Sequence, residues 1–500
     1  MKTASSLLMP VLRCACMALG LLVCAGLPAS STTVSIAAPG RQAGELERVQ
    51  MHANKVHGLH YLPNWLPSDA PEPAQFTLQP VTSIPLDGDP ELNVRGTVYP
   101  IRWNSKAAFG FVHVNGYRLL RVYAADGHKV WQVDAPSGRV HRDNVHTDSL
   151  AVFDVNGDGA QDIVHCWTMP GSSAKQLVAR DGRNGAVLSQ VSLPGQSKSD
   201  ECQIAAFRVA GADRPYLFVA GKAPAASGCA GNYEDTFSQT IVFRADPTRL
   251  TKLWEQTTCA AGHYAYPLDR DGNGKADAIF VGKYLFAPDG TLLCTLPGWG
   301  TDHIDSMVVA DLDDTSRGQE VFAAGYSGVR LYHARDCTLA WTIDNKSIVH
   351  PQHATATRLQ ASGALDLLVT QKLVDADPDA FAQHAYIVGK SGQIIGGYND
   401  MTAIFATPLQ NADLDGAPAI EDRLTTFGQV VDGSGNRRLT TDWYWELGGL
   451  TAEEKLLDVR DQWARSPFAF DLDNDGRDEL IVWGRHVLMV GTLRNPPAEP

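Results

Sequence analysis

Residues 144–167 read NVHTDSLAVFDVNGDGAQDIVHCW, and this stretch decides the fold. At its centre, residues 154–162 form an acidic loop in which oxygen-bearing side chains recur at alternate positions. A short apolar run leads into the loop and another leads out of it, which predicts two strands joined by a tight charged connection. His146 and His165 lie at the outer ends of these two runs.

The same unit recurs along the chain. Full copies of the acidic loop occupy residues 154–162, 269–277 and 471–479, and partial copies begin at Asp311 and Asp413. The blocks at residues 204–219 and 354–369 keep the apolar frame without the acids. A period of roughly 40 to 60 residues built from short strands is typical of propeller blades. We therefore predict an all-β fold, a seven-bladed β-propeller, with eight blades if residues 98–133 form a blade of their own. We also expect the N-terminal strands to close the propeller against the last unit, which ends near Leu493.

The acidic loops predict calcium sites. Oxygen ligands at alternate positions, a glycine for the sharp turn and a final carboxylate suit a hard cation with flexible coordination. Because the loops recur with the frame, a bound ion would be structural and would join the first strand of each unit to the second. The alternative is an acidic turn that only caps a hairpin. The predicted ligands are Asp154, Asn156, Asp158, Asp162, Asp269, Asp271, Asn273, Asp277, Asp471, Asp473, Asp475 and Glu479.

The N-terminal region differs from the rest of the chain. Lys2 precedes an apolar run at residues 19–26, and small residues follow, so residues 1–30 predict a signal peptide and a secreted or periplasmic protein. A lipoprotein anchored through Cys24 is the alternative, although Val23 stands where a small residue is expected. Residues 31–95 are rich in proline without a sustained period, which predicts a linker and an irregular segment before a propeller domain at residues 96–495.

Composition narrows the possible partners. The net charge of −14, from 42 basic and 56 acidic residues, argues against nucleic acid. No internal stretch is apolar and long enough to span a bilayer. Outside the signal region the cysteines are Cys166, Cys202, Cys229, Cys259, Cys294 and Cys337. An even number in an exported chain favours disulfides, with buried free thiols as the alternative, and leaves the pairing open.

The repeat also predicts which residues share a face. The start of each first strand, the end of each second strand and the loop that follows lie at one edge, whereas the acidic loops lie at the opposite edge. The chain has 15 histidines, and several of them are predicted to lie at the edge opposite the acidic loops. An imidazole-rich and partly cationic edge on an acidic protein is where we expect chemistry. The histidines at these positions are His146, His165, His263, His303, His350 and His353.

Three motifs surround the second full acidic loop: GHY at residues 262–264, GKY at 282–284 and WGTDHIDS at 299–306. They resemble propeller-type polysaccharide lyases, more closely the ulvan lyases and more distantly the rhamnogalacturonan lyases, over about residues 95–490. The resemblance implies β-elimination at a uronic acid of an anionic polysaccharide. It also implies a pair of histidines, a tyrosine and an arginine as functional residues, and zinc in addition to calcium.

The reaction needs a group that neutralises the uronate carboxylate, a base for the C5 proton and an acid for the departing oxygen. His146 and His165 match the family's histidine pair, one as base and the other as carboxylate partner. Tyr233 is the candidate acid, and it is a candidate for the base as well, with an ordinary loop aromatic as the alternative. The arginine has no evident match. The candidate substrate-binding cations are Lys222, Lys283 and Arg465.

A zinc site is predicted at three or four of His263, His303, His350, His353 and a cysteine, because neutral imidazoles that converge from consecutive blades suit this ion. Direct contact of these side chains with sugar is the alternative. Two functional classes stay open. The first is an exported, monomeric lyase acting on an anionic polysaccharide, and the second is a calcium-stabilised propeller that binds carbohydrate or protein without catalysis. A third and weaker possibility follows from DGHKVW at residues 126–131, which echoes quinoprotein propellers without their vicinal cysteine pair.

Overall fold

Every regular element in the described part of the chain is a β-strand. The computed structural model describes residues 77–85, 96–103, 109–115, 119–134, 150–168, 175–193, 202–221, 239–262, 265–270, 276–310, 312, 319–358, 365–371, 382–402, 410–412, 422–424, 430–431, 437–439, 468–470, 472, 479–483 and 487–494. All of them belong to one structural unit, Val34–Pro500. No helix in these ranges is long and apolar enough to cross a membrane.

The strands form four-stranded antiparallel sheets, which we number in chain order. Sheet 1 contains β2 (Gly96–Arg102), β3 (Phe109–Asn115), β4 (Leu119–Ala124) and β5 (Lys129–Asp134). Sheet 2 contains β6 (Leu150–Phe153), β7 (Asp162–Thr168), β8 (Lys175–Arg180) and β9 (Val187–Leu193). Sheet 3 contains β10 (Cys202–Phe207), β11 (Tyr216–Gly221), β12 (Gln239–Asp246) and β13 (Arg249–Thr257). Sheet 4 contains β14 (Ala265–Leu268), β15 (Ala278–Val281), β16 (Tyr284–Phe286) and β17 (Leu292–Thr295).

The second half of the chain follows the same plan. Sheet 5 contains β18 (Ser306–Ala310), β19 (Glu320–Gly325), β20 (Gly328–His333) and β21 (Thr338–Asp344). Sheet 6 contains β22 (Pro351–Arg358), β23 (Leu365–Gln371), β24 (Ala382–Val388) and β25 (Ile394–Thr402). Sheet 7 contains β26 (Gln410–Ala412), β27 (Asp422–Leu424), β28 (Val430–Val431) and β29 (Arg437–Leu439). Sheet 8 contains β30 (Phe468–Phe470), β31 (Glu479–Trp483), β32 (Val487–Arg494) and β1 (Thr77–Pro85).

The described residues therefore form eight such sheets, and the arrangement is consistent with a β-propeller. The prediction of seven blades is wrong, because residues 98–133 lie in a sheet of their own, which was the stated alternative. The sequence repeat was counted from the acidic loops and their frames. Sheet 1 has no such loop between its first two strands, so this count missed it.

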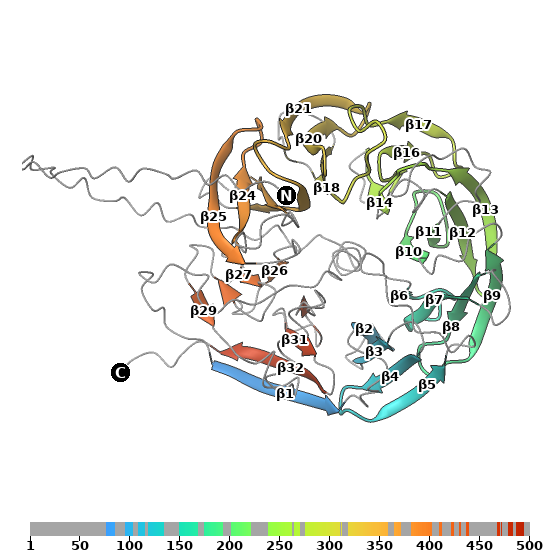
Figure 1. The fold of residues 1–500 in the computed structure, drawn as a ribbon. Coiled ribbons are helices and arrows are strands. Elements are labelled where there is room, and N and C mark those ends of the chain that lie inside the picture. Colours follow the sequence, from blue (N-terminus) through green and yellow to red (C-terminus); the bar gives the residue numbers. More distant parts are fainter. Residues whose placement is uncertain are drawn as a thin grey trace, which may run out of the picture. The chain divides into compact units, whose positions relative to one another are not determined.

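The first strand of the chain completes the last sheet. Strand β1 pairs antiparallel with β32, with Thr77 opposite Arg494 and Pro85 opposite Val487, and the two lie side by side at opposite ends of the colour scale in Figure 1. A strand from the N-terminal part of the chain thus closes the last sheet, as expected, but it lies before residues 98–133, where the first strands were predicted. The expectation that residues 31–95 are irregular is wrong for Thr77–Pro85. Its two prolines are tolerated because β1 is an edge strand, and the pairing shifts register after Pro80.

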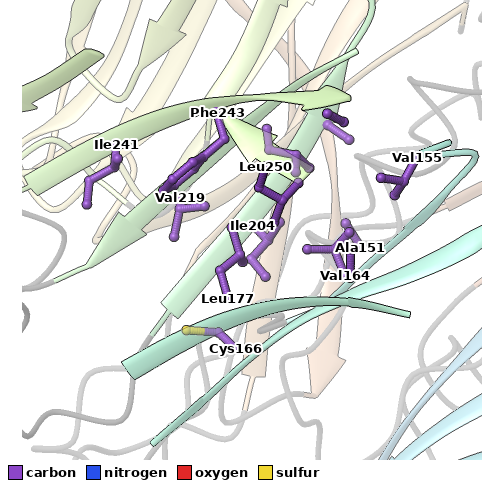
Figure 2. Packing of buried hydrophobic residues seen from close by; sticks show 14 of the residues in the cluster. Ala151, Val155, Val164, Cys166, Leu177, Ile204, Val219, Ile241, Phe243 and Leu250 are labelled. Carbon is purple, nitrogen blue, oxygen red and sulfur yellow. The ribbon is translucent and has the colours of Figure 1, made fainter. Parts of the chain in front are cut away.

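Consecutive sheets pack through the two faces of their strands. In β7, Ile163 and Trp167 belong to a buried cluster shared with sheet 1, whereas Val164 and Cys166 belong to a cluster shared with sheet 3. Figure 2 shows the second cluster, in which Leu177 of sheet 2 lies among Ile204 and Phe243 of sheet 3. Similar clusters join sheets 3 and 4, 4 and 5, and 5 and 6. Burial of each large aliphatic side chain contributes about 1.5–3 kcal/mol, so these junctions hold the unit together.

Each described acidic loop joins the first strand of its sheet to the second, as predicted. In the loop of sheet 2, the backbone N–H of Val155 donates to Asp162 Oδ2 at 3.0 Å. Equivalent bonds recur in the other loops, which shows that the last acid of each loop is a structural acceptor. They run from Arg270 to Asp277, from Leu312 to Glu320 and from Leu472 to Glu479.

Four cysteines in the described part of the chain form disulfides. Cys294 of β17 forms a disulfide with Cys337, which lies in the turn before β21. Cys166 and Cys259 are also disulfide-bonded. The expectation of disulfides is thus confirmed for these four cysteines.

Candidate functional site

Sheets 4, 5 and 6 bring several predicted residues to one edge, opposite the connections between their first and second strands. The turn between β15 and β16 carries Lys283, and the connection from β17 to β18 carries His303. The turn between β19 and β20 carries Tyr326, and the connection from β21 to β22 carries His350. Contacts between these segments confirm that strand starts and second-strand ends share an edge here. We call this group of four residues, together with Asp302 and Asp305, the edge site.

Glycines let the backbones of the edge site approach one another. A Cβ atom on Gly325 would lie 2.6 Å from the carbonyl oxygen of His303 and 2.7 Å from the Trp299 ring. Gly262 has a φ of +117° and forms an isolated bridge with Ile304, and a Cβ atom there would lie 2.3 Å from the Ile304 oxygen. Larger residues at either position would push the His303 segment out of place.

A buried carboxylate organises the two described histidines of the edge site. Asp305 is 3% exposed. Its Oδ1 lies 3.2 Å from His303 Nε2, and its Oδ2 lies 3.9 Å from His350 Nε2. His303 also lies 3.7 Å from Asp302 through Nδ1. The structure thus brings two of the four predicted zinc ligands to one aspartate. Residue 263 lies outside the described ranges, and the side chain of His353 is not described.

Lys283 has a different role from the predicted one. It is buried, and its Nζ donates to the backbone oxygen of Gly300 at 2.7 Å and to that of Asp302 at 3.3 Å. Because its ammonium is committed to backbone carbonyls, Lys283 holds the loop that leads to His303. The prediction of direct substrate contact is therefore replaced by a positioning role.

His165 lies in the middle of β7 and not at its end, since the strand continues to Thr168. The side chain is 2% exposed, and Nε2 accepts a hydrogen bond from Arg180 Nε at 3.0 Å. Its ring packs against Trp167 with centroids 4.2 Å apart. Burial, and then the charge of Arg180, hold the pKa of His165 well below its usual value, so the imidazole is neutral. The expectation that His165 lies at the open edge is wrong.

Arg180 is an arginine that the sequence did not single out. It is half-buried at the end of β8, and its Nη1 also donates to the Gly185 oxygen at 2.9 Å. Burial lowers its pKa. The only sequence signal was an arginine that ends an apolar strand before the tight turn of residues 181–186. The histidine partner lies in the neighbouring strand and cannot be inferred from that pattern.

The acidic loop of sheet 2 is described in full. Asp154 Oδ1 accepts from Gly157 N at 2.6 Å, and Asp154 Oδ2 accepts from Gly159 N at 2.9 Å. Asp158 Oδ1 accepts from Ala160 N, and its Oδ2 forms an ion pair of 2.6 Å with Arg183. Burial opposes ionisation of Asp158, but these partners together with Asn156 hold its pKa below the usual value.

Asp162 is the acid of this loop whose ionised form is least favoured. It is fully buried, and its Oδ1 has no hydrogen-bond partner within the described ranges. Burial, reinforced by the charges of Asp158 and Asp181, raises the pKa of Asp162 to about 7. A cation at this oxygen would relieve both effects, and the all-oxygen donor set suits calcium.

The remaining observations on the described ligand candidates do not show a metal site. In sheet 4, Asp277 is paired with the guanidinium of Arg270 at 3.2 Å, and Asp269 is the other described ligand candidate. Within the part of the chain that the structure describes, no group of three or more His, Cys, Asp or Glu residues is arranged to hold a metal ion. Calcium and zinc are therefore kept as proposals.

Several predicted residues lie outside the described ranges. They are His146, Tyr233, Lys222, Arg465, His263, Asp271, Asn273, Asp471, Asp473 and Asp475. Glu479 is described, and it is the buried acceptor for Leu472.

Comparison with known proteins gives a distant relationship. No family model matches the chain. The rhamnogalacturonan exolyase YesX of Bacillus subtilis (strain 168) is 27% identical over 290 residues, which cover 49% of this chain and 44% of that protein. The chain thus matches less than half the length of this relative. The similarity is to a rhamnogalacturonan lyase and not to an ulvan lyase, so the order of the two resemblances predicted from the motifs is reversed.

The fold is similar to that of several solved structures. Rhamnogalacturonan lyase YesW has a TM-score of 0.54 at 16% identity, covering 81% of this chain and 75% of that one. The Bacillus licheniformis rhamnogalacturonan lyase PL11 has a TM-score of 0.53 at 17% identity, covering 84% and 75%. The V. cholerae biofilm matrix protein Bap1 has a TM-score of 0.51 at 12% identity, covering 85% and 92%. Identities this low show the fold alone.

Proposed function

We propose that the protein is a lyase that cleaves a uronic-acid-containing anionic polysaccharide by β-elimination, with rhamnogalacturonan as the first candidate. The observation that supports this most is the 27% identity over 290 residues to a rhamnogalacturonan exolyase. The similarity of fold to two rhamnogalacturonan lyases agrees with it. Ulvan, which the motifs favoured, is the second candidate polymer.

The burial of His165 limits its role in the reaction. His165 is buried, and its Nε2 lone pair is occupied by Arg180, so it is poorly placed to remove a proton from a large substrate. We therefore assign removal of the C5 proton to His146 and protonation of the leaving oxygen to Tyr233. Arg180 and His165 would act by holding the second and third strands of sheet 2 in place. Arg465 and Lys222 stay as candidates for neutralising the uronate carboxylate.

Two metals belong to the proposal. Calcium would be held by the loops that contain Asp154, Asp269 and Asp471, where it would neutralise the carboxylates and fasten the first strand of a sheet to the second. Zinc would be held by histidines from the set of His263, His303, His350 and His353, with a structural role. The fully buried and unpartnered Asp162 Oδ1, as far as the described residues go, supports the calcium site.

We also propose that the protein is exported and acts as a monomer. The disulfide between Cys294 and Cys337 agrees with an oxidising compartment, where the predicted signal peptide would direct the chain.

The test is to incubate the protein with rhamnogalacturonan, ulvan and a neutral polysaccharide, and to follow the ultraviolet absorbance of unsaturated uronate ends. We expect absorbance to rise with a uronate polymer and not with the neutral one. His146→Ala should abolish the activity while calcium-dependent stability stays intact. His128→Ala is the matched control, because His128 is an exposed turn residue of sheet 1. Absence of unsaturated ends from every uronate polymer would rule out the lyase.

A second candidate is a propeller that binds carbohydrate or protein without catalysis. Two observations favour it: the similarity of fold to a biofilm matrix protein, and the burial of one of the two predicted catalytic histidines. Retention of the polymer without cleavage would support this function over the first.

A further inference from the structure

We propose that Tyr326 is a stacking platform for a sugar ring, so that a polysaccharide lies across the turn between β19 and β20. The proposal rests on the proposed function for the class of ligand, a pyranose polymer. It assigns Tyr326 to substrate binding and not to chemistry.

The first observation is the exposure of Tyr326. Its exposed fraction is 58%, the highest among the described large apolar side chains, and the next highest is 51% at Leu292. The others lie on the fourth strands of their sheets, except Val349, which precedes His350. Tyr326 instead lies at the edge site, beside His350. More than half of the Tyr326 side chain is therefore open to a ligand at the edge site.

The second observation is that the turn is held rigidly. Gly325 and Gly328 pair directly, so Tyr326 and Ser327 form a two-residue connection. Ser327 N donates to Asp302 Oδ2 at 2.8 Å, and Arg330 Nη1 donates to Ser327 Oγ at 3.1 Å. Gly328 has a φ of +123°, and a Cβ atom there would lie 2.3 Å from the Ile343 oxygen. Little further order would be lost when a ligand binds.

The third observation is the neighbour that orients the ring. The imidazole of His350 meets the Tyr326 ring edge to face, with centroids 5.0 Å apart and an angle of 86°. His350 itself has a φ of +44°, a left-handed conformation that is uncommon for residues other than glycine. Such strain is concentrated at binding and catalytic sites.

The chemistry of the ligand follows from this surface. A pyranose ring presents apolar C–H groups on its faces and hydroxyl groups around its rim. A rigid tyrosine offers a flat apolar face together with a hydroxyl group, at a low cost in side-chain entropy. The polar groups around it, His303, His350 and Asp302, suit a hydroxyl-rich rim better than they suit the apolar surface of a protein partner.

The experiment compares Tyr326→Ala and Tyr326→Phe with the wild type and with Leu339→Ala, an exposed control from the same sheet. Affinity for rhamnogalacturonan and for ulvan is measured by electrophoresis in gels that contain each polymer, and KM and kcat are measured by the unsaturated-uronate assay. We expect Tyr326→Ala to weaken binding and raise KM about tenfold with kcat unchanged, as loss of one stacked ring implies. The affinity and KM of Tyr326→Phe should stay within about threefold of the wild-type values. All three variants should have the same melting temperature as the wild type.

The outcomes separate this inference from the proposed function. Cleavage by the wild type, with the same KM and affinity in Tyr326→Ala, would overturn the stacking role and leave the lyase standing. Binding without cleavage that is lost in Tyr326→Ala would support the stacking role although the lyase has failed. A wild type that neither binds nor cleaves these polymers would overturn both.

Discussion

Cys294 occupies in sheet 4 the register position that tryptophan occupies in sheets 1, 3 and 5, and its disulfide with Cys337 replaces the tryptophan's link to the next sheet. Trp131, Trp254 and Trp341 each lie on a fourth strand, immediately after the register shift in that strand, as Cys294 does. Their indole N–H groups donate to Gly182 O, Pro288 O and Lys390 O, in the turn of the following sheet.

The partner positions correspond as well. Gly185, Gly290 and Gly392 have φ values of +75°, +87° and +81° and lie against the tryptophan rings. Cys337 has a φ of +59° in the same turn of sheet 5. Between sheets 2 and 3 the position is Ser189, whose Oγ accepts from Leu250 N at 2.8 Å. The same position of the fourth strand thus links each of sheets 1 to 5 to the next sheet. The link is an indole hydrogen bond, a serine hydrogen bond or a disulfide.

Removing the disulfide should destabilise the protein. For a separation of 43 residues, Cys294→Ser with Cys337→Ser should cost about 3–4 kcal/mol, because the unfolded chain regains the freedom of the loop. Melting temperature under oxidising conditions is the measurement, since a reductant would also break the disulfides of Cys166 and Cys259. Cys294→Trp with Cys337→Gly should recover part of the loss. Equal melting of this pair and the serine pair would argue against equivalence of the links.

The contact between Trp254 and the turn of sheet 4 can be measured through Gly290. A Cβ atom on Gly290 would lie 2.6 Å from the Trp254 ring, whereas a Cβ atom on Gly211 would meet nothing within 4 Å. Both glycines have positive φ, so Gly290→Ala and Gly211→Ala share a backbone cost of about 1 kcal/mol. We expect Gly290→Ala to lose about 1–3 kcal/mol more. Chemical denaturation compares the two, and equal losses would contradict the packing argument.

Asp162 should make the calcium-free protein less stable as pH rises. Its folded pKa of about 7 lies above the unfolded value near 3.8, so its contribution is complete below pH 4 and is lost as pH rises through 7. The loss amounts to at most about 4 kcal/mol. Thermal melts with a chelator at pH 5 and 7 should show this trend, and calcium should reverse it. Asp162→Asn should remove both the trend and the response at this loop. A chelated wild type as stable at pH 7 as at pH 5 would refute the prediction.

His165 should make the protein less stable as pH falls, which is the opposite pH dependence to that of Asp162. Its folded pKa lies well below the usual 6.5, so its stabilising contribution is present above pH 6.5 and is lost as pH falls towards the folded pKa. His165→Gln should therefore reduce acid sensitivity below pH 6.5 in an Asp162→Asn background. Nitrogen chemical shifts of the imidazole should report a neutral ring at pH 6. A protonated ring at that pH would contradict the buried contact with Arg180.

His146→Ala should affect activity, whereas His165→Ala should affect stability. Loss of His146 should remove activity and leave the melting temperature within about a degree of wild type. Loss of His165 should cost about 2–4 kcal/mol of stability because a buried ring and its hydrogen bond are removed. Steady-state rates and melts on the same preparations separate these effects. A stable but inactive His165→Ala would restore it as a catalytic residue.

The sequence predicted the repeating frame well because every acidic loop carries its own signal. The bond from Val155 to Asp162 and its equivalents are local, so the pattern of acids reveals them. The sequence did not predict where the strands end. An apolar run shows that a strand exists, but the run at residues 163–164 gives no sign that β7 continues past His165 to Thr168.

Contacts between strands and sheets were harder to predict. The bond from Arg180 to His165 joins residues 15 apart, and Asp305 lies between histidines that come from different connections. Strand β1 was overlooked for another reason, because Pro80 and Pro85 are strand breakers except at a sheet edge. Trp131 is part of the motif DGHKVW, but the role of the tryptophans in linking sheets can be seen only from the register of the fourth strands.

The pairing of β1 with β32 ties the two ends of the described chain into one sheet. Sheets 1 to 7 are hairpins of neighbouring strands and can form as the chain emerges, whereas sheet 8 must wait until its last strand has been made. Closing a loop of this length is entropically costly and makes it a late step in folding. Until then both Thr77–Pro85 and Val487–Arg494 present unpaired edges that are prone to aggregation.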